Sequence, residues 1–396
     1  MLPVRALAAV IVLLGAGTAR GTQGILLLGD DPIRVGRAGA AVAAVGDASW
    51  MAFNPAGLDG LDRRVESGLA VIHSRATLHT RGIAEVPFRG TMVDDEWNGL
   101  PSLGLVLPKE YGTFGLGLYL PTGAMLHFPQ SRSWVGLLEG MNDRRIEFVQ
   151  PRLTLGYAYH LDSGWILGVN VNGSLSVGRT DQITPRLLAS RGNYKWDCAP
   201  GAGFGLGVLR RWDRWSFGAA LQSRQWSKGF DTYRDISAHP VDMPATFQTG
   251  VAYKITPTLE MELDYRFINW SDVKFFHEPS SGAGLGWHDQ HAVMVGMEWT
   301  ASPRWTFRAG YGHVTRAMRD DHIFGSALVP NVATDHVGAG FTCVLSERSE
   351  ITVALAHFFK GNQTASGGGD LYARLGKASE STLQVDWMSL NYSLKF

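Results

Sequence analysis

Residues 259–267 read Leu259-Glu-Met-Glu-Leu-Asp-Tyr-Arg-Phe267, and this stretch decides the fold. Every odd position carries an apolar or aromatic side chain, and every even position carries a charge. Because successive side chains of a β-strand point to opposite faces, the alternation predicts a strand with one apolar and one charged face. A continuous apolar face suits lipid, and a row of charges suits water. The stretch therefore predicts a strand that separates lipid from a polar interior.

The same period of two governs the chain from about residue 65 to its end. Residues 165–177 have Trp, Leu, Val or Gly at odd positions and mostly Asn or Ser between them, and residues 304–313 place three aromatic rings on one face. A soluble β-sandwich also alternates. However, the strands read roughly 9–13 residues long, as a tilted membrane strand requires. Trp and Tyr also gather near the ends of the apolar faces, as in membrane girdles.

The connections between these strands alternate between short and long. The short ones lie at residues 108–112, 160–164, 210–214, 255–258, 301–304 and 346–349. The long ones lie near residues 77–100, 122–143, 180–194, 227–242, 270–287, 314–334 and 360–384. Short periplasmic turns and long outer loops are typical of an all-β, antiparallel transmembrane barrel, here of about 14 strands, with roughly 12 or 16 left open. The terminal Phe396 resembles the signature that the outer-membrane assembly machinery reads.

The first residues predict a secretory signal. Arg5 precedes the apolar run 6–14, which small residues follow up to Ala19 and Gly21. A cationic start, a short apolar core and a small-residue exit are typical of a signal peptide. We therefore assign residues 1–21 to it, with cleavage after Ala19 or Gly21, and expect the mature chain in the bacterial outer membrane.

Composition and motifs exclude other classes. The net charge is zero, so no nucleic-acid partner is expected. No nucleotide-binding, metalloprotease or serine-hydrolase motif appears, so we predict no enzyme and no cofactor. The stretch from His288 to His291 predicts the start of a strand rather than a metal site. Cys198 and Cys343 are too few for a disulfide framework or a tetrahedral zinc site, and we expect both to be free.

Residues 22–62 do not alternate. The Ala-rich centre predicts a short helix that ends at Gly46, and Pro55 prevents a continuous helix further on. The rest reads as compact backbone with many turns. A small apolar segment ahead of a barrel can fold into the lumen, so we divide the mature chain into a plug at residues 22–62 and a barrel at residues 63–396.

Two motifs in this segment point to a family. Residues 36–41 read Gly-Arg-Ala-Gly-Ala-Ala, and residues 53–58 read Phe-Asn-Pro-Ala-Gly-Leu. They resemble the N-terminal hatch of the FadL family of long-chain fatty acid transporters, which includes TodX-type channels for aromatic hydrocarbons. Further likeness follows in order at residues 263–272, 305–311 and 329–341. The family usually carries Arg where this chain has His336, so a role of that Arg does not carry over.

The resemblance implies a plugged barrel that takes a hydrophobic ligand from outside. The hatch then shifts, and the ligand leaves sideways through a gap where one strand is kinked. Candidate ligand-binding residues in the hatch are Phe53, Asn54 and Pro55. The kinked element is expected at Gly115, Gly117 and Pro121, although ordinary lumen-facing small residues explain the glycines equally well.

Cations on lumen faces are candidates for holding a ligand carboxylate. They are Arg152, Lys254, Arg266 and Arg308. The planar guanidinium groups of the three arginines suit bidentate contact with a carboxylate. The alternative is internal pairing of Arg266 and Arg308 with Glu262 and Asp264.

The predicted function is passive uptake of long-chain fatty acids or other hydrophobic compounds across the outer membrane. Expected partners are the hydrophobic small molecule, outer-membrane lipid and lipopolysaccharide, and the barrel assembly machinery. The alternative is a non-transport barrel that acts as a scaffold or shuttle for secreted proteins. An enzyme at the barrel rim is the third and weakest reading.

Overall fold

A computed structural model of the chain describes residues 23–29, 31–80, 90–128, 144–180, 195–233, 239–279, 284–323, 326, 329–368, 374 and 376–396. The predicted signal peptide at residues 1–21 lies outside these residues, as do parts of the long loops. Among the described helices, none is both long and apolar enough to cross a membrane.

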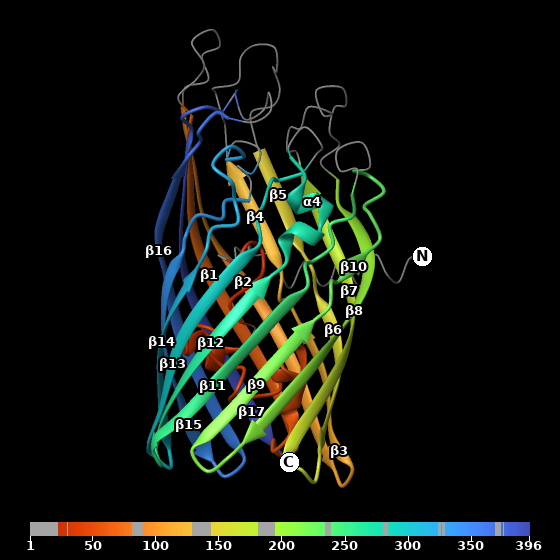
Figure 1. Cartoon of the computed structure of the whole chain (residues 1–396), viewed down its shortest axis with the longest axis vertical. Helices are drawn as coiled ribbons and strands as arrows, with labels where there is room; N and C mark the ends of the chain where they lie inside the picture. Colours follow the sequence, from red (N-terminus) through yellow and green to blue (C-terminus); the bar gives the residue numbers. More distant parts are fainter. Residues whose placement is uncertain are drawn as a thin grey trace.

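The strands form one antiparallel sheet that closes on itself (Figure 1). Closure comes from β1, which pairs with β2 along one edge and with β17, the last strand, along the other. The strands are β1 (Arg64–Thr80), β2 (Gly90–Lys109), β3 (Gly112–Tyr119), β4 (Gly123–Phe128), β5 (Arg144–Val149), β6 (Arg152–His160), β7 (Trp165–Thr180), β8 (Asp197–Arg211), β9 (Trp215–Gln222), β10 (Trp226–Ser227), β11 (Thr246–Thr256), β12 (Leu259–Ile268), β13 (Gln290–Ser302), β14 (Trp305–Val314), β15 (Asp335–Ser346), β16 (Ser349–Thr364) and β17 (Glu380–Lys395).

Three pairs of these segments are single crossings with an interruption. They are β3 with β4, β5 with β6, and β9 with β10, each separated by two or three residues. The 17 segments minus these three interruptions give 14 crossings, as the sequence predicts. The six predicted short connections are also confirmed, because tight turns join the strands at each of those places.

The alternation of the sequence becomes the inside and outside of the barrel. On β7, Leu167, Val169 and Val171 face outward with 43%, 48% and 57% of their surface exposed. On β12, Glu262 and Asp264 face inward and are buried. In lipid every backbone polar group needs a partner within the protein, which a closed barrel provides. The apolar exposed face is therefore the face that contacts the membrane.

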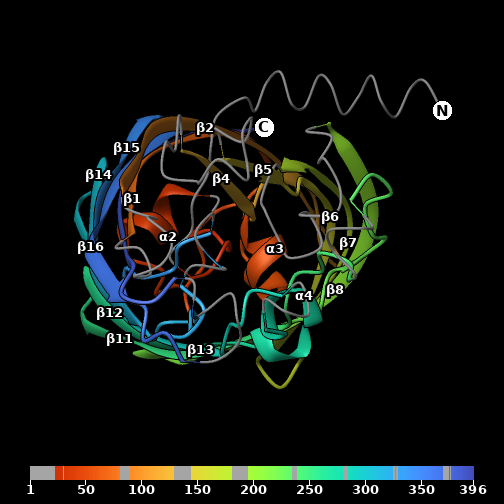
Figure 2. The ribbon, with the colours of Figure 1, turned by 90° about the horizontal axis from the view of Figure 1, so that it is seen from above.

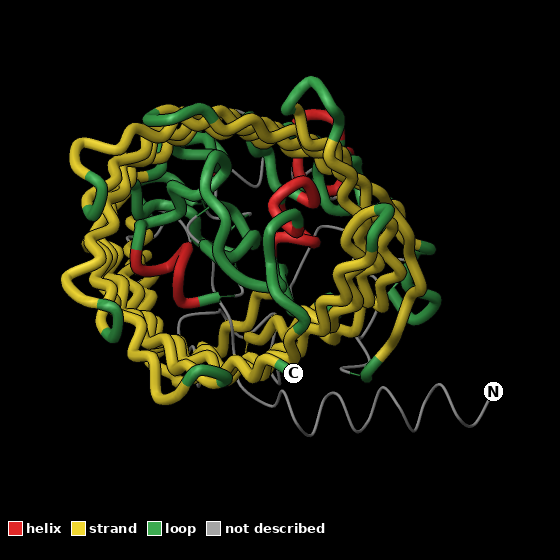
Figure 3. Tube along the Cα trace, turned by 90° about the horizontal axis from the view of Figure 1, so that it is seen from below, coloured by secondary structure: helices red, strands yellow, loops and turns green. Residues whose placement is uncertain are grey.

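Residues 23–62, here called the N-terminal segment, lie inside the ring of strands (Figures 2 and 3). Its helices are α2 (Pro32–Gly36), α3 (Trp50–Phe53) and the 3-10 helix η1 (Pro55–Leu58). Asp31 caps α2 by accepting the N–H of Arg34 at 2.7 Å. The predicted helix before Gly46 is wrong, because residues 40–46 form turns and bends. The backbone N–H groups there bind side chains of the wall instead.

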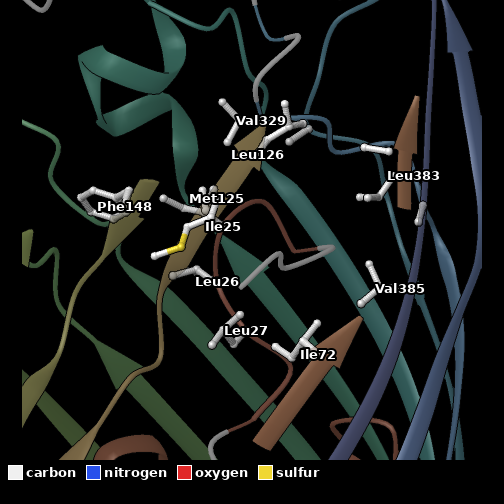
Figure 4. Packing of buried hydrophobic residues seen from close by; sticks show 14 of the residues in the cluster. Ile25, Leu26, Leu27, Ile72, Met125, Leu126, Phe148, Val329, Leu383 and Val385 are labelled. Atoms are coloured by element: carbon white, nitrogen blue, oxygen red, sulfur yellow. The ribbon is translucent and has the colours of Figure 1, made fainter. Parts of the chain in front are cut away.

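An apolar cluster fills the lumen on the side of the long loops (Figure 4). Ile25, Leu26 and Leu27 of the N-terminal segment pack there against β1, β4, β5 and β17. The outer-loop elements η3 (Trp270–Asp272) and α4 (Lys274–His277) add fully buried aromatic rings. The interior is therefore divided into this apolar part and a polar part around the N-terminal segment.

Candidate functional site

Two carboxylates of β12 hold the N-terminal segment against the wall. Asp264 Oδ2 accepts the backbone N–H groups of Ala41 and Val42 at 2.9 and 3.0 Å. Glu262 Oε1 accepts the N–H of Ala43 at 2.6 Å. Hydrogen bonds from N–H groups to a carboxylate are about twice as strong as neutral ones. They also explain why residues 41–43 are not helical, since a helix would direct these donors along its own axis.

Arg37 completes this attachment. Its guanidinium lies 2.7 Å from Glu262, 3.5 Å from Glu260 and 3.9 Å from Glu298, and the side chain is 1% exposed. A buried charge is tolerated only when it is paired and hydrogen-bonded. The acidic face predicted from residues 259–267 therefore binds a cation that belongs to the N-terminal segment.

The predicted partners of two lumen arginines are wrong. Arg308 donates to Glu298 Oε2 at 2.7 Å, and Arg266 donates to the Gln23 side chain at 2.6 Å. Neither pairs with Glu262 or Asp264 in the described structure. The physical reason is that Arg37 and the amides of residues 41–43 already occupy those carboxylates.

The motif at residues 53–58 lies against two glycines of the wall. Asn54 donates to the Val42 carbonyl at 2.8 Å and accepts the N–H of Ala56 at 3.3 Å. A Cβ at Gly207 would overlap the Asn54 side chain, and one at Gly168 would overlap the Ala56 backbone. The motif therefore fixes backbone geometry at a close approach, and Asn54 and Pro55 do not line the nearby cavity.

A small cavity of about 60 Å³ lies between the N-terminal segment and the wall. Four of its lining residues were predicted from the sequence, and a further one, Arg34, was not. The cavity is lined by Arg34, Phe53, Pro121, Arg152 and Arg266, among others. Arg308, Gly115 and Gly117 lie elsewhere. A lone cation between the apolar residues 32–36 is the signal that points to Arg34.

Three guanidinium groups from three elements converge on this cavity. Arg34 of α2 lies 3.9 Å above the ring of Phe53, which places a cation on an aromatic face. Arg152 of β6 donates to Gln150 at 2.9 Å, and Arg266 belongs to β12. With Leu26, Leu27 and Phe53 in the same lining, the cavity combines an apolar surface with positive charge.

Pro121 lies where the wall is interrupted between β3 and β4. Residues 103–109 of β2 pair with β3, whereas β4 pairs with β5 on its other side. Among the described residues, no β-ladder joins β4 to residues 90–102 of β2. One hydrogen bond bridges this gap, because the backbone N–H of His127 donates to the side-chain Oδ1 of Asp94 at 2.6 Å.

The N-terminal segment pairs with this interruption. Leu27 N–H donates to the Pro121 carbonyl at 3.0 Å, and Gly123 N–H donates to the Ile25 carbonyl at 3.1 Å. An isolated bridge also joins Leu26 to Thr122. The segment thus supplies backbone partners at the place where the ladder of the wall is incomplete.

The two predicted glycines of β3 have packing roles. A Cβ at Gly115 would lie 2.7 Å from Met51 of α3. A Cβ at Gly117 would overlap the ring of Tyr119. Both glycines therefore leave room for groups on the inner face, and the interruption itself comes at Pro121.

Comparison with known proteins finds a family model that matches the C-terminal part of the chain. Residues 232–396 match the family described as outer membrane protein transport protein (OMPP1/FadL/TodX). The match covers less than half of the chain, and over these residues the chain is similar to that family. No curated protein matches the sequence. The resemblance noted at residues 36–41 and 53–58 lies upstream of the matched region.

Solved structures show that the fold of this chain is shared by known barrels. The toluene transporter TodX of Pseudomonas putida shares 15% identity, with a TM-score of 0.73, over 95% of this chain and 99% of that one. A FadL homologue of Pseudomonas aeruginosa shares 18% identity, with a TM-score of 0.66, over 94% and 100%. The toluene transporter TbuX of Ralstonia pickettii shares 16% identity, with a TM-score of 0.68, over 93% and 99%. The likeness in fold therefore covers nearly the whole chain.

Proposed function

We propose that this barrel is an outer-membrane channel for the passive uptake of hydrophobic compounds, and that its N-terminal segment is the hatch that gates it. One observation carries the proposal. An apolar and cationic cavity lies between the small N-terminal segment and an interruption in the wall that faces lipid. A channel that only admitted water-soluble molecules would need neither the apolar lining nor the interruption.

The hatch has to shift before a ligand can pass. The cavity of about 60 Å³ is smaller than the roughly 150 Å³ that holds one benzene molecule in a protein core. The described arrangement is therefore a closed state. Because hydrogen bonds hold residues 41–43 against β12, their contacts with Asp264 and Glu262 can be exchanged for contacts with water.

The exit in this proposal is sideways, through the interruption between β2 and β4. A hydrophobic ligand released there enters lipid directly and avoids water, which the hydrophobic effect favours. Pairing of residues 25–27 with residues 121–123 seals this exit in the closed state. The outer wall lies against lipid and lipopolysaccharide, and we propose that the assembly machinery reads the strand that ends at Phe396.

The ligand class that fits best is an apolar chain with a carboxylate, as in a long-chain fatty acid. Arg34, Arg152 and Arg266 provide charge for the carboxylate, and the apolar cluster provides a surface for the chain. Neutral hydrocarbons, such as the toluene that the names of TodX and TbuX mention, would use the apolar surface alone.

The test compares solute uptake by cells that lack the chain with uptake by the same cells after they express it. We expect expression to raise uptake of a labelled long-chain fatty acid or of toluene. Arg152→Gln with Arg266→Gln should lower fatty acid uptake severalfold and leave toluene uptake unchanged. The matched control is Arg214→Gln, an exposed residue in the short turn between β8 and β9. Equal uptake with and without the chain, for both solutes, contradicts the proposal, and a stoichiometric protein partner would then favour a scaffold.

A further inference from the structure

A group of three buried carboxyl groups lies where the N-terminal segment meets β1. Asp31 and Asp47 belong to the segment, and Glu66 belongs to β1. Ser49 connects the first two, because its hydroxyl donates to Asp31 at 2.9 Å and its N–H donates to Asp47 at 2.8 Å. Ala48 N–H donates to Glu66 at 3.0 Å. All three acids line one cavity of about 10 Å³.

Two of these acids face a cation and the third does not. Arg34 interacts with Asp31, and Arg64 lies 3.4 Å from Glu66. Asp47 forms no ion pair among the described residues. Asp47 lines the cavity and is only 2% exposed. Its Oδ2 atom is buried and has no hydrogen-bond partner.

The remaining surroundings of Asp47 add no positive charge. β3 contributes the hydroxyl of Tyr119, β17 contributes the amide of Asn391, and β2 contributes Ser102 and Gly104. An ionised carboxylate that is buried without a cation costs several kcal/mol, so such a group takes up a proton instead. Burial, followed by the charges of Asp31 and Glu66, raises the pKa of Asp47 well above its usual range.

We infer that Asp47 is a proton-binding site that is occupied only while the N-terminal segment is seated against β1, so that loss of the proton favours release of the segment. Asp47 lies on the segment itself, and leaving the barrel wall would return it to water. In water its carboxyl group ionises at its ordinary pKa of 3.8. Release is therefore coupled to loss of one proton. This inference concerns the seating of the segment and rests on the proposed function only where release is taken to open the channel.

The sign of the pH dependence follows from this linkage. Because its pKa is raised only in the seated state, Asp47 binds up to one proton more there than in the released state at pH values between its ordinary and its raised pKa. Raising the pH in that range destabilises the seated state, by up to about tenfold in the equilibrium constant per pH unit. Below both values, seating is independent of pH. Opening is thus expected to increase toward alkaline pH.

The test measures seating directly and needs no transported substrate. Val42→Cys places a thiol on a fully buried position of the segment, in a full-length chain that also carries Cys198→Ser and Cys343→Ser. A water-soluble methanethiosulfonate reagent then reports release between pH 5 and about pH 9. Asp47→Asn, which imitates the protonated acid, is compared in the same background. Dividing one labelling rate by the other cancels the pH dependence that comes from ionisation of the thiol, because both chains carry the same thiol.

We expect the ratio, Asp47 chain over Asp47→Asn chain, to rise with pH. Asp162→Asn, an exposed acid in the short turn between β6 and β7, should keep the rise. Asp31→Asn removes one of the charges that favour the proton, so the rise should level off at lower pH. A ratio that stays constant over this pH range overturns the inference. Folding of each chain is checked in parallel by the change in gel mobility that a folded barrel shows on heating. Failure of uptake with a rising ratio would instead overturn only the transport proposal.

Discussion

At the residue scale, the attachment of the N-terminal segment depends on a buried ion pair. Arg37→Ala leaves Glu262 buried without its cation, and such a loss typically costs about 3–5 kcal/mol. We expect a lower free energy of unfolding for this variant, measured by denaturant titration in detergent micelles. The double variant with Glu262→Ala should recover part of the loss. Equal losses in the single and double variants would show that the pair is not what stabilises the contact.

Wall glycines are a second feature at this scale. Gly207→Ala introduces a methyl group that overlaps Asn54, whereas Gly173→Ala introduces one that meets no atom within 4 Å. We expect the first change to destabilise the seated segment by about 1–3 kcal/mol, as overpacking does. The second should have no such effect. Limited proteolysis of the segment measures the difference, and resistance of both variants would contradict the close approach.

At the scale of elements, the contact between the N-terminal segment and the wall interruption is the decisive one. Leu26→Cys with Thr122→Cys, in a chain without its natural cysteines, places two thiols at an antiparallel bridge. Oxidation should join them and abolish uptake, and a reductant should restore it. The matched control is Ser346→Cys with Ser349→Cys, a pair in the short turn between β15 and β16, which should leave uptake unchanged. Undiminished uptake through a cross-linked Leu26–Thr122 pair would exclude this exit.

Elements also show where sequence reasoning stopped. Alternation predicted the strands because it reflects the local geometry of each one. The absence of a helix before Gly46 could not be predicted, because the carboxylates that bind residues 41–43 come from β12, more than two hundred residues away. Likewise, the partners of Arg266 and Arg308 depend on which lumen groups the N-terminal segment has already engaged.

At the scale of the whole molecule, the apolar outer face fixes the barrel in lipid. Val171→Arg introduces a charge on an outward position that is 57% exposed. A charge on the lipid face near the middle of the bilayer costs about 2–4 kcal/mol. We therefore expect a lower yield of folded barrel in lipid vesicles. Asp162→Arg, in the short turn between β6 and β7, is the control. Equal folding of both variants would show that this face does not contact lipid.

The sequence by itself determined the approximate number of crossings, the two faces of each strand, the short turns and the presence of a non-alternating segment ahead of the barrel. These follow from residue-to-residue periodicity, which needs no knowledge of distant parts. It also supplied the candidates Phe53, Pro121, Arg152 and Arg266, since their types and faces are local properties.

Only the tertiary structure decided which of those candidates meet. Closure of the sheet brings α2, β6 and β12 around one cavity, and it brings residues 25–27 to the interruption after β3. It also buries Asp31, Asp47 and Glu66 together, although nothing in their spacing predicts it. The physical reason is that burial and charge pairing depend on distances through space, which a closed barrel sets only when all of its strands are in place.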